Sequence, residues 1–461
     1  MENSVFHRFL NYGGLLILRL NSRFPFLERL WDLASHFRKV EVILFKGTIR
    51  NGSNRTSTLF VGSQDVAYLI ADLMYSKIDK AQSLGKYPSF QVKPRRLPNA
   101  DIIVACVGKL LTRKFTKNGY ILLPSVSFTL NLKRPTCDMV KAMSRRRRRD
   151  LAKLKTHNYS YKVARAPDDE KNFDIFYWKM YHPYITRRFG KAAIPRSYLE
   201  SKDCYKNNGG IIFVQDADKP IAGILFQTRG KTVKALSLGV YDGNTEHMEA
   251  LAGQAALFFL IEWAKSEGIV SLNYGHTAPF PTYGNFEYKK EWGMTLEKED
   301  APFCALKLNN LTRGSLSFLS QNPFIFSDET SMKIALFADH SITRTELEHI
   351  THEYQFPKID SLVIISANAQ DTEPTSSTEA PMRNGKAQNL FTGPLSNACT
   401  LLQRRGLNVK TYEVSAPKHS RTPKNHRIES AQPSVPITRW FNRFTQDFKH
   451  ATLTQQTLNS N

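Results

Sequence analysis

The chain has 461 residues, of which 41% are hydrophobic and 11% aromatic, so it is long enough to bury the cores of two or three domains. Its 64 lysine and arginine residues outnumber 41 acidic residues, and the net charge of +23 favours nucleic acid, phosphorylated cofactors or an anionic membrane as partners. The composition excludes a wholly disordered chain, and the apolar run at residues 13–18 is far too short to cross a bilayer.

The excess positive charge lies on the two flanks of the sequence. Residues 1–150 hold 27 lysines and arginines against 10 acidic residues, and residues 417–461 hold 7 against 2. Residues 151–416 are nearly balanced, with 30 against 29. The positive charge therefore belongs to particular segments and not to the whole chain.

The first predicted elements belong to the basic flank. Residues 1–40 mix apolar side chains with arginines, which predicts helices packed on the neighbouring domain; an amphipathic helix on a membrane surface is the alternative. Residues 41–140 alternate between strand-like and helix-like patterns and are expected to form an α/β unit. Its predicted strands are 41–45, 58–61, 101–107 and 120–123, and its predicted helix is 63–76.

Five consecutive arginines open a predicted basic helix over residues 144–157. On this helix Arg145, Arg149 and Lys153 share one face, because residues four apart lie above one another. Arg145 and Arg149 are the candidates for contact with donor phosphates; the favoured alternative is that the run is a solvated basic linker between the two halves. A DNA-reading module is not expected, because no helix-turn-helix, zinc-finger or RNA-binding aromatic pattern accompanies the run.

The balanced central region predicts a helix, three antiparallel strands, a buried helix and further strands. The first helix has an apolar stripe from Phe173 to Tyr181 and is expected to stop at Pro183. Short polar turns separate the three strand patterns. The second helix, 246–266, is apolar on nearly all sides, which predicts burial. The predicted strands are 211–214, 221–227, 232–240 and 270–274.

The pattern weakens after residue 310. Residues 311–415 predict a small α/β lobe, interrupted by a Ser/Thr/Pro/Asn-rich insert at 367–386 that is expected to be disordered. Residues 416–461 are polar and basic and predict a disordered tail. The elements expected in the lobe are 332–337, 344–354, 362–366, 398–404 and 408–414.

Three stretches resemble the FemAB-like and BioF2-like branch of the bacterial GNAT acyltransferases. They are SRRRRRDLAKLK at 144–155, FDIFYWKMYHPYITRRFG at 173–190 and NYGHTAPFPTYGNFEYKKEWG at 273–293. The resemblance covers residues 100–325. It implies an α/β (α+β) fold with two GNAT-like halves, 41–140 and 141–310, made of mixed sheets flanked by helices. In this fold the sheet splays open between the strand before the buried helix and the strand after it. Acyl donor and amine acceptor meet in this split.

The resemblance implies an N-acyltransferase that forms a ternary complex, with acyl-CoA as cosubstrate and no tightly bound cofactor. One position departs from the familiar pattern, because the buried helix opens with DGNTEHM instead of a glycine-rich loop. Carboxylates at a helix N-terminus satisfy the helix dipole and repel phosphate. Aminoacyl-tRNA, the donor of FemAB-type enzymes, is therefore kept as an alternative. A non-catalytic, polyanion-binding protein on a decayed acyltransferase fold is the rival of a different class.

Candidate site residues follow from the expected split. His276 lies just past a strand end and suits a general base, and Tyr181 could donate a hydrogen bond to an oxyanion or thiolate. The expected substrate-binding residues are Arg187, Arg188, Tyr283, Asn285 and Lys289. For each, a structural or surface role is the alternative.

Other sequence features define the expected setting. The five cysteines lack metal-ligand spacing, so no metal site is expected, and their separation suits reduced thiols in the cytoplasm. A small-molecule amine or amino sugar is the expected acceptor. Peripheral contact with a membrane is compatible with the positive charge, whereas DNA is not an expected partner.

Overall fold

The computed structural model describes residues 39–166, 170–190, 195–327, 331–354, 356–369, 395–404 and 407–415. The predicted N-terminal helical segment lies outside the described residues except for its last two positions. The predicted tail lies outside them entirely, and the predicted insert at 367–386 does so except for its first three residues. None of the helices in the described ranges is long and apolar enough to cross a membrane.

The N-terminal half contributes five strands to a single large sheet. Helix α3 (Gln64–Met74) packs on one face of these strands and helix α4 (Lys109–Thr116) on the other, each with its own buried cluster. The strands are β1 (Lys39–Ile49), β2 (Arg55–Gly62), β3 (Tyr75–Pro88), β4 (Ile102–Ala105) and β5 (Ile121–Asn131).

The second half contributes the other six strands. They are β6 (Tyr159–Arg165), β7 (Gly209–Asp216), β8 (Lys219–Arg229), β9 (Thr232–Val240), β10 (Ser271–Thr277) and β11 (Thr295–Leu308). The helices of this half are α7 (Glu170–Asp174), the π-helix η3 (Ile175–Tyr181), α8 (His182–Phe189), α9 (Tyr198–Lys206), α10 (Thr245–Glu249), α11 (Ala252–Ser266) and α12 (Gly284–Glu291).

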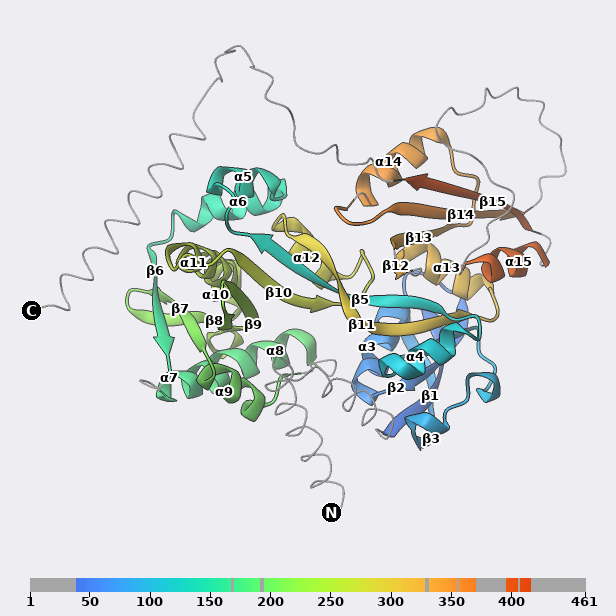
Figure 1. Cartoon of the computed structure of the whole chain (residues 1–461), viewed down its shortest axis with the longest axis horizontal. Helices are drawn as coiled ribbons and strands as arrows, with labels where there is room; N and C mark the ends of the chain where they lie inside the picture. Colours follow the sequence, from blue (N-terminus) through green and yellow to red (C-terminus); the bar gives the residue numbers. More distant parts are fainter. Residues whose placement is uncertain are drawn as a thin grey trace, which may run out of the picture.

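The two halves share one eleven-stranded mixed sheet, which runs across the molecule in Figure 1. The strand order is β3-β1-β2-β4-β11-β5-β10-β9-β8-β7-β6. Strand β5 of the first half lies between β10 and β11 of the second, and β11 also pairs with β4. The sheet therefore interleaves the halves, and the second half is completed by a strand from the N-terminal half.

The sheet opens between β9 and β10. These two parallel strands pair only through three residues each, Thr232–Lys234 and Ser271–Asn273. Beyond this point β10 continues along β5, whereas Ala235–Val240 of β9 stay paired with β8 alone. The predicted split, between the strand before the buried helix and the strand after it, is therefore present.

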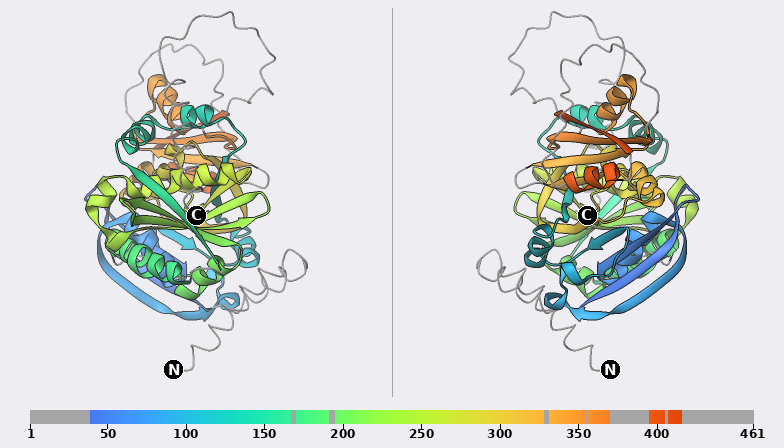
Figure 2. Two further views of the ribbon diagram at one scale, coloured as in Figure 1. Left: turned by 90° about the vertical axis from the view of Figure 1, so that its left-hand side faces the viewer. Right: turned by 90° about the vertical axis from the view of Figure 1, so that its right-hand side faces the viewer.

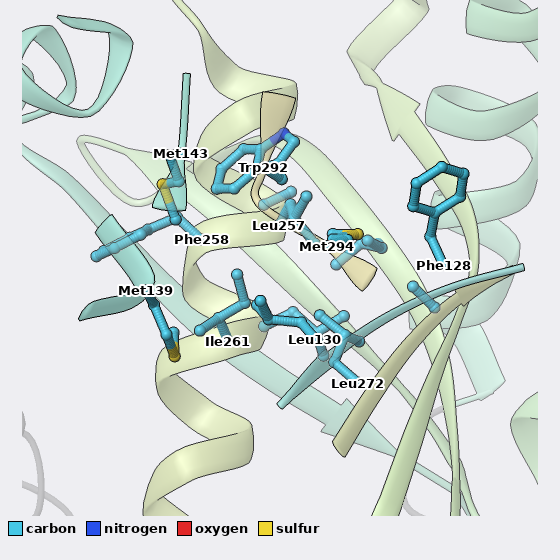
Figure 3. Packing of buried hydrophobic residues seen from close by; sticks show 14 of the residues in the cluster. Phe128, Leu130, Met139, Met143, Leu257, Phe258, Ile261, Leu272, Trp292 and Met294 are labelled. Atoms are coloured by element: carbon cyan, nitrogen blue, oxygen red, sulfur yellow. The ribbon is translucent and has the colours of Figure 1, made fainter. Parts of the chain in front are cut away.

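Helix α11 is covered on nearly all sides. Eleven of its fifteen residues are buried, and it contacts β6, β7, β8 and β9. Figure 3 shows Phe258 and Ile261 of α11 facing Met139 and Met143, with Trp292 and Met294 nearby. The opposite face of β7–β9 is covered by η3, α8 and α9. The order of helix, sheet and helix layers explains why the α11 sequence is apolar all round.

A small lobe follows the sheet, as the sequence predicts. Its own sheet has the order β12-β13-β14-β15, and its helices are α13 (Arg313–Gln321), α14 (Arg344–Tyr354) and α15 (Ser396–Arg404). The lobe leans on α12, because Lys290 donates to the carbonyl of Glu353 at 3.0 Å and Phe286 packs edge-on against Phe356. The strands are β12 (Phe324–Ser327), β13 (Met332–Ala338), β14 (Ser361–Ala369) and β15 (Leu407–Ser415).

Two predicted helices differ from the structure. The helix expected over 246–266 is divided into α10 and α11 at Leu251, whose φ of 65° is left-handed. The helix expected to stop at Pro183 continues through it, because the proline occupies the first turn of α8, where its missing N–H is not needed. The turn before it has widened into a π-helix. The spacing of the hydrophobic residues predicts neither the break at Leu251 nor the π-helix.

The arginine run separates into one buried side chain and a solvated group. Helix α6 (Arg145–Leu154) begins at Ser144, whose hydroxyl accepts from the backbone N–H of Arg147. The Arg147 side chain is only 4% exposed and lies over the ring of Tyr288. Its guanidinium donates to Glu291 at 2.6 and 2.9 Å and to Asp150 at 2.9 Å. Arg147 therefore fixes α6 to α12.

We expect Arg147→Ala to lower the free energy of unfolding by about 3 kcal/mol, because two carboxylates lose a largely buried partner. The measurement is urea unfolding followed by circular dichroism. Arg145→Ala with Arg149→Ala is the matched control; both side chains are exposed, and the change should stay within about 0.5 kcal/mol. Equal effects of the two variants would contradict the structural role of Arg147.

Candidate active site at the split of the sheet

A buried lysine lies at the point where β10 leaves β9. The pairing of β10 with β5 shifts its register between Asn273 and His276. Gly275 lies inside this shift with a φ of 77°, a conformation that favours glycine. Lys289 of α12 donates from Nζ to the carbonyl oxygens of Gly275 at 2.9 Å and His276 at 2.7 Å. The lysine therefore donates hydrogen bonds to two backbone carbonyls at the point where the pairing of β10 with β5 is interrupted.

Lys289 has an altered acidity. Its side chain is 2% exposed, and Nζ lies 5.7 and 5.9 Å from the ring centroids of Tyr274 and Phe128. Burial lowers the pKa of Lys289 to about 7, since the low-polarity surroundings disfavour the ammonium. Amine and ammonium therefore coexist near neutral pH. When the amine form donates both N–H groups to the two carbonyls, it retains one lone pair.

His276 is the titratable side chain on the open end of β10. It is 51% exposed, and its Nδ1 lies 3.8 Å from Oε1 of Glu299 on β11. Burial lowers the pKa of His276 below its ordinary value of 6.5, and the Glu299 carboxylate opposes this shift. The imidazole is therefore mostly neutral at pH 7. A neutral imidazole beside a carboxylate can accept a proton from a substrate.

An arginine–tyrosine cluster lies beside this point. Arg188 on α8 donates a hydrogen bond to the hydroxyl of Tyr184. Burial raises the pKa of Tyr274 and of Tyr283, and the charge of Arg188 opposes the rise in both. Arg188 thus contacts Tyr184, and its charge affects the titration of a tyrosine on β10 and of one at the start of α12.

A cavity of about 370 Å³ lies next to Tyr283, between the N-terminal half and the loop before α12. Its lining includes Arg50 and Asp72, which are hydrogen-bonded to each other, and Thr282 and Tyr283. The Thr282 hydroxyl is buried and has no hydrogen-bond partner among the described residues. Small-molecule pockets have volumes of about 300–1,000 Å³, so the cavity can hold a small polar ligand.

The predicted site residues are only partly brought together. The amine of Lys289 lies on the backbone of His276, and Arg188 lies near Tyr283. Arg187 instead donates to the carbonyl of Gly243 at 3.0 Å, and Asn285 is exposed on α12.

Three further predicted site residues lie away from the split or are already engaged. The Tyr181 hydroxyl is buried and accepts from the backbone N–H of Arg196 at 2.7 Å. Arg145 and Arg149 are exposed on α6. These positions do not by themselves test a catalytic or binding role, so the roles of all nine residues stay predictions.

Sequence reasoning missed two side chains of this region, Tyr274 and Glu299. Tyr274 stands in a stretch that carries the family resemblance, but a tyrosine there is equally compatible with core packing. Glu299 lies on β11 and reaches His276 only because β5 lies between β10 and β11. No local sequence pattern predicts the contact between Glu299 and His276.

The start of the buried helix offers little for a phosphate. Asn244 caps α10 by accepting from the N–H of Glu246 at 2.7 Å, and Glu246 itself lies in the first turn. Its carboxylate adds negative charge where a pyrophosphate would approach. Among the residues that the structure describes, no group of three or more His, Cys, Asp or Glu side chains could hold a metal ion.

The chain was compared with protein families, curated proteins and solved structures. No family model and no curated protein matches it. Similar structures include FemX, with 11% identity over 57% of this chain and 83% of that chain and a TM-score of 0.33. L-PGS from Bacillus licheniformis is 10% identical over 60% and 88% of the two chains, with a TM-score of 0.31. A GCN5-related N-acetyltransferase from Sphaerobacter thermophilus is 9% identical over 54% and 72%, with a TM-score of 0.27.

The fold class follows from the structure itself. The strand order, the buried helix between β9 and β10, and the separation of these strands after three residue pairs define a GNAT-like mixed α/β fold. The small four-stranded lobe is an appendage to it.

We expect the stability of the protein to rise with pH between about 7 and 9, because the unfolded chain binds a proton on Lys289 that the folded chain has lost. The rise from this group is at most about 1.4 kcal/mol per pH unit. Lys289→Met should flatten it, as measured by urea unfolding at several pH values. Lys153→Met, which removes an exposed lysine, should retain the slope, and a slope unchanged in Lys289→Met would contradict the assigned pKa.

Proposed function

We propose that the protein is an N-acyltransferase, which transfers an acyl group directly from a donor to an amine without acylating itself. The observation that carries the proposal is the opened split between β9 and β10, with His276 and the buried Lys289 at its end. Residues 235–240 of β9 have no strand partner on the β10 side among the described residues. Backbone N–H groups on such an edge are suited to bind the carbonyl oxygen of an acyl group.

His276 acts as general base in this proposal. It removes the proton from the acceptor nitrogen as this nitrogen attacks the acyl carbonyl carbon. A C–N bond forms, the bond between the acyl carbon and the leaving sulfur breaks, and the thiolate takes up a proton. The Glu299 carboxylate stabilises the positively charged imidazolium that forms when His276 takes up this proton. Lys289 is a positioning residue, because it binds the carbonyl of His276 and fixes the register of β10.

The cavity next to Tyr283 is the proposed binding place for the amine acceptor. It is polar, and Asp72 supplies a carboxylate that can pair with an ammonium group. Tyr283 lines this cavity, and both Asp72 and Arg188 affect its pKa, which supports an acceptor site beside the arginine–tyrosine cluster. A small amine or an amino sugar suits these groups, because amides and carboxylates bind hydroxyl and ammonium donors.

An acyl thioester such as acyl-CoA is the proposed donor, with aminoacyl-tRNA as the alternative. The alternative is favoured by the start of α10, where Glu246 offers a carboxylate instead of free N–H groups for a pyrophosphate. Activity with either donor would support acyl transfer. Failure of both, with a panel of amines that includes amino sugars, would reject it.

We expect His276→Gln to lower kcat about 10²–10⁴-fold with little change in KM, because the substitution removes the base and retains the fold. In the wild type, kcat/KM should fall as pH drops through the pKa of His276, below 6.5. Glu299→Gln should move this limb to still lower pH, because the carboxylate raises the pKa of His276. An unchanged limb in His276→Gln would show that another group is the base.

The donor can be identified by the salt dependence of binding. For acyl-CoA, with few phosphate groups, we expect a shallow dependence; for tRNA it is steep, because many counterions are released. Arg145→Ala with Arg149→Ala should leave donor affinity nearly unchanged, since both side chains are solvated on α6. The measurement is a titration monitored by fluorescence. A steep dependence that this double variant flattens would favour tRNA and a binding role for the two arginines.

A further inference from the structure

Apart from Tyr68 on α3, the large hydrophobic side chains exposed on the described surface form two groups. The first group lies on β3 and the short helix η1 (Ser89–Gln91) and consists of Ile78, Tyr87 and Phe90. The second lies on η3 and α9 and consists of Ile175, Trp178 and Leu199, of which Trp178 is 52% and Leu199 58% exposed. Single exposed apolar residues are ordinary, but groups of them mark an interaction surface.

The group on η3 and α9 is organised around Trp178. Its ring stacks on Tyr198 with 5.6 Å between the centroids, and Leu199 follows directly in the chain. The neighbouring carboxylate of Asp174 accepts from the Tyr198 hydroxyl at 2.7 Å. Glu170 is paired with two lysines of α9, Lys202 and Lys206. Near the exposed indole, Glu170 is therefore paired with two cations and the Asp174 carboxylate is hydrogen-bonded.

The group on β3 and η1 lies in the most one-sidedly basic part of the described chain. Residues 80–137 contain eleven lysines and arginines and a single acid, Asp101, which accepts hydrogen bonds from Thr56 and Ser57. Lys93 and Arg96 are exposed directly after Phe90. The exposed cations of the adjacent α4 add to this surface; they are Arg113, Lys114 and Lys117.

Arg95 donates to Asn118 at 2.8 Å, which joins the segment after η1 to the end of α4 and so connects the first group with the α4 cations. In Figure 1 and Figure 2 the elements β3, α7, α8 and α9 all lie toward the lower side of the molecule, whereas α6 and α14 lie at the upper side. Both aromatic groups therefore belong to one side, here named the aromatic-basic face.

We propose that the aromatic-basic face docks on the surface of an anionic lipid bilayer. Tryptophan, tyrosine and phenylalanine side chains partition into the interface between head groups and acyl chains. Exposed Ile175 and Leu199 can enter the acyl boundary, where no hydrogen-bond partner is required. Lysines and arginines around them are attracted by the negative surface potential of anionic lipids. Aromatic and cationic groups together supply the two signals that stable peripheral binding needs.

RNA is the competing polyanion, and the apolar residues argue against it. Aromatic rings stack on bases, but exposed isoleucine and leucine side chains gain little from a nucleic acid. The exposed aliphatic residues therefore favour lipid, while the positive charge alone would suit either partner.

The test is cosedimentation of the full chain with vesicles of phosphatidylcholine alone and of phosphatidylcholine mixed with phosphatidylglycerol. We expect binding to the mixed vesicles only, weakening as salt is raised. Lys93→Glu with Arg96→Glu should reduce binding about tenfold or more. The matched control is Arg148→Glu with Lys153→Glu, which makes the same charge change on exposed residues of α6 at the upper side and should bind like the wild type.

A second measurement reports the aromatic contact directly. Trp263 and Trp292 are buried, so Trp178 is the exposed tryptophan of the described residues. In a background where Trp31 and Trp440, which lie outside the described residues, are replaced by phenylalanine, its fluorescence should shift to the blue on addition of mixed vesicles. Trp178→Phe should then abolish the shift while circular dichroism shows an intact fold. Equal loss of binding in the control variant would overturn the proposal, as would binding to RNA homopolymer without binding to vesicles. Neither measurement requires acyltransferase activity, so its outcome is independent of the proposed function.

Discussion

The separation of β9 from β10 is the constraint on which the rest of this structure depends. Parallel strands normally continue to pair, because each backbone group that leaves a ladder must find another partner. Here β10 turns to β5, and the amine of Lys289 takes the carbonyls of Gly275 and His276. The opening is thus compensated on the β10 side, while one edge of β9 remains free for a ligand.

This compensation has an energetic cost that suits a functional site. Enclosing a lysine costs free energy unless the charge is paired, and the hydrogen bonds to two neutral carbonyls offset only part of the loss. Part of this cost is avoided because burial lowers the pKa of Lys289, so that the neutral amine is populated near pH 7. Arg147 is also buried, but two carboxylates face its guanidinium, whereas the Lys289 amine faces only neutral carbonyl oxygens. The two buried cations therefore differ in their partners.

Sequence reasoning predicted the elements whose side chains have a clear periodicity. The three strands β7–β9 and the burial of α11 followed from short polar turns and an all-round apolar helix, as did the elements of the lobe at 332–337 and 344–354. Strand β3 was missed because YSKIDKAQSLGKYP is almost wholly exposed at the sheet edge and has no apolar alternation. Helix α12 was not among the predicted elements, since its glycine and tyrosine resemble turn residues.

For the candidate site, residue type was predictable and placement was not. His276 and Lys289 were selected for their chemistry and the strand that precedes them, and the structure puts the amine of one on the backbone of the other. The burial that alters Lys289 comes from Phe128 and Tyr274, on two strands that meet only after folding. Likewise, nothing local to the arginine run marks Arg147 as the buried member, because its partner Glu291 is 144 residues away.

The insertion of β5 between β10 and β11 has a consequence for biosynthesis. Strands β4 and β5 leave the ribosome long before β10 and β11, which begin at Ser271 and Thr295. Until then the nascent N-terminal half presents apolar strands with unfilled hydrogen bonds, a state prone to pairing with other chains. A chain that ends before β10 cannot complete its sheet. The interleaved order therefore requires the central sheet to be completed late, after β10 and β11 have been synthesised.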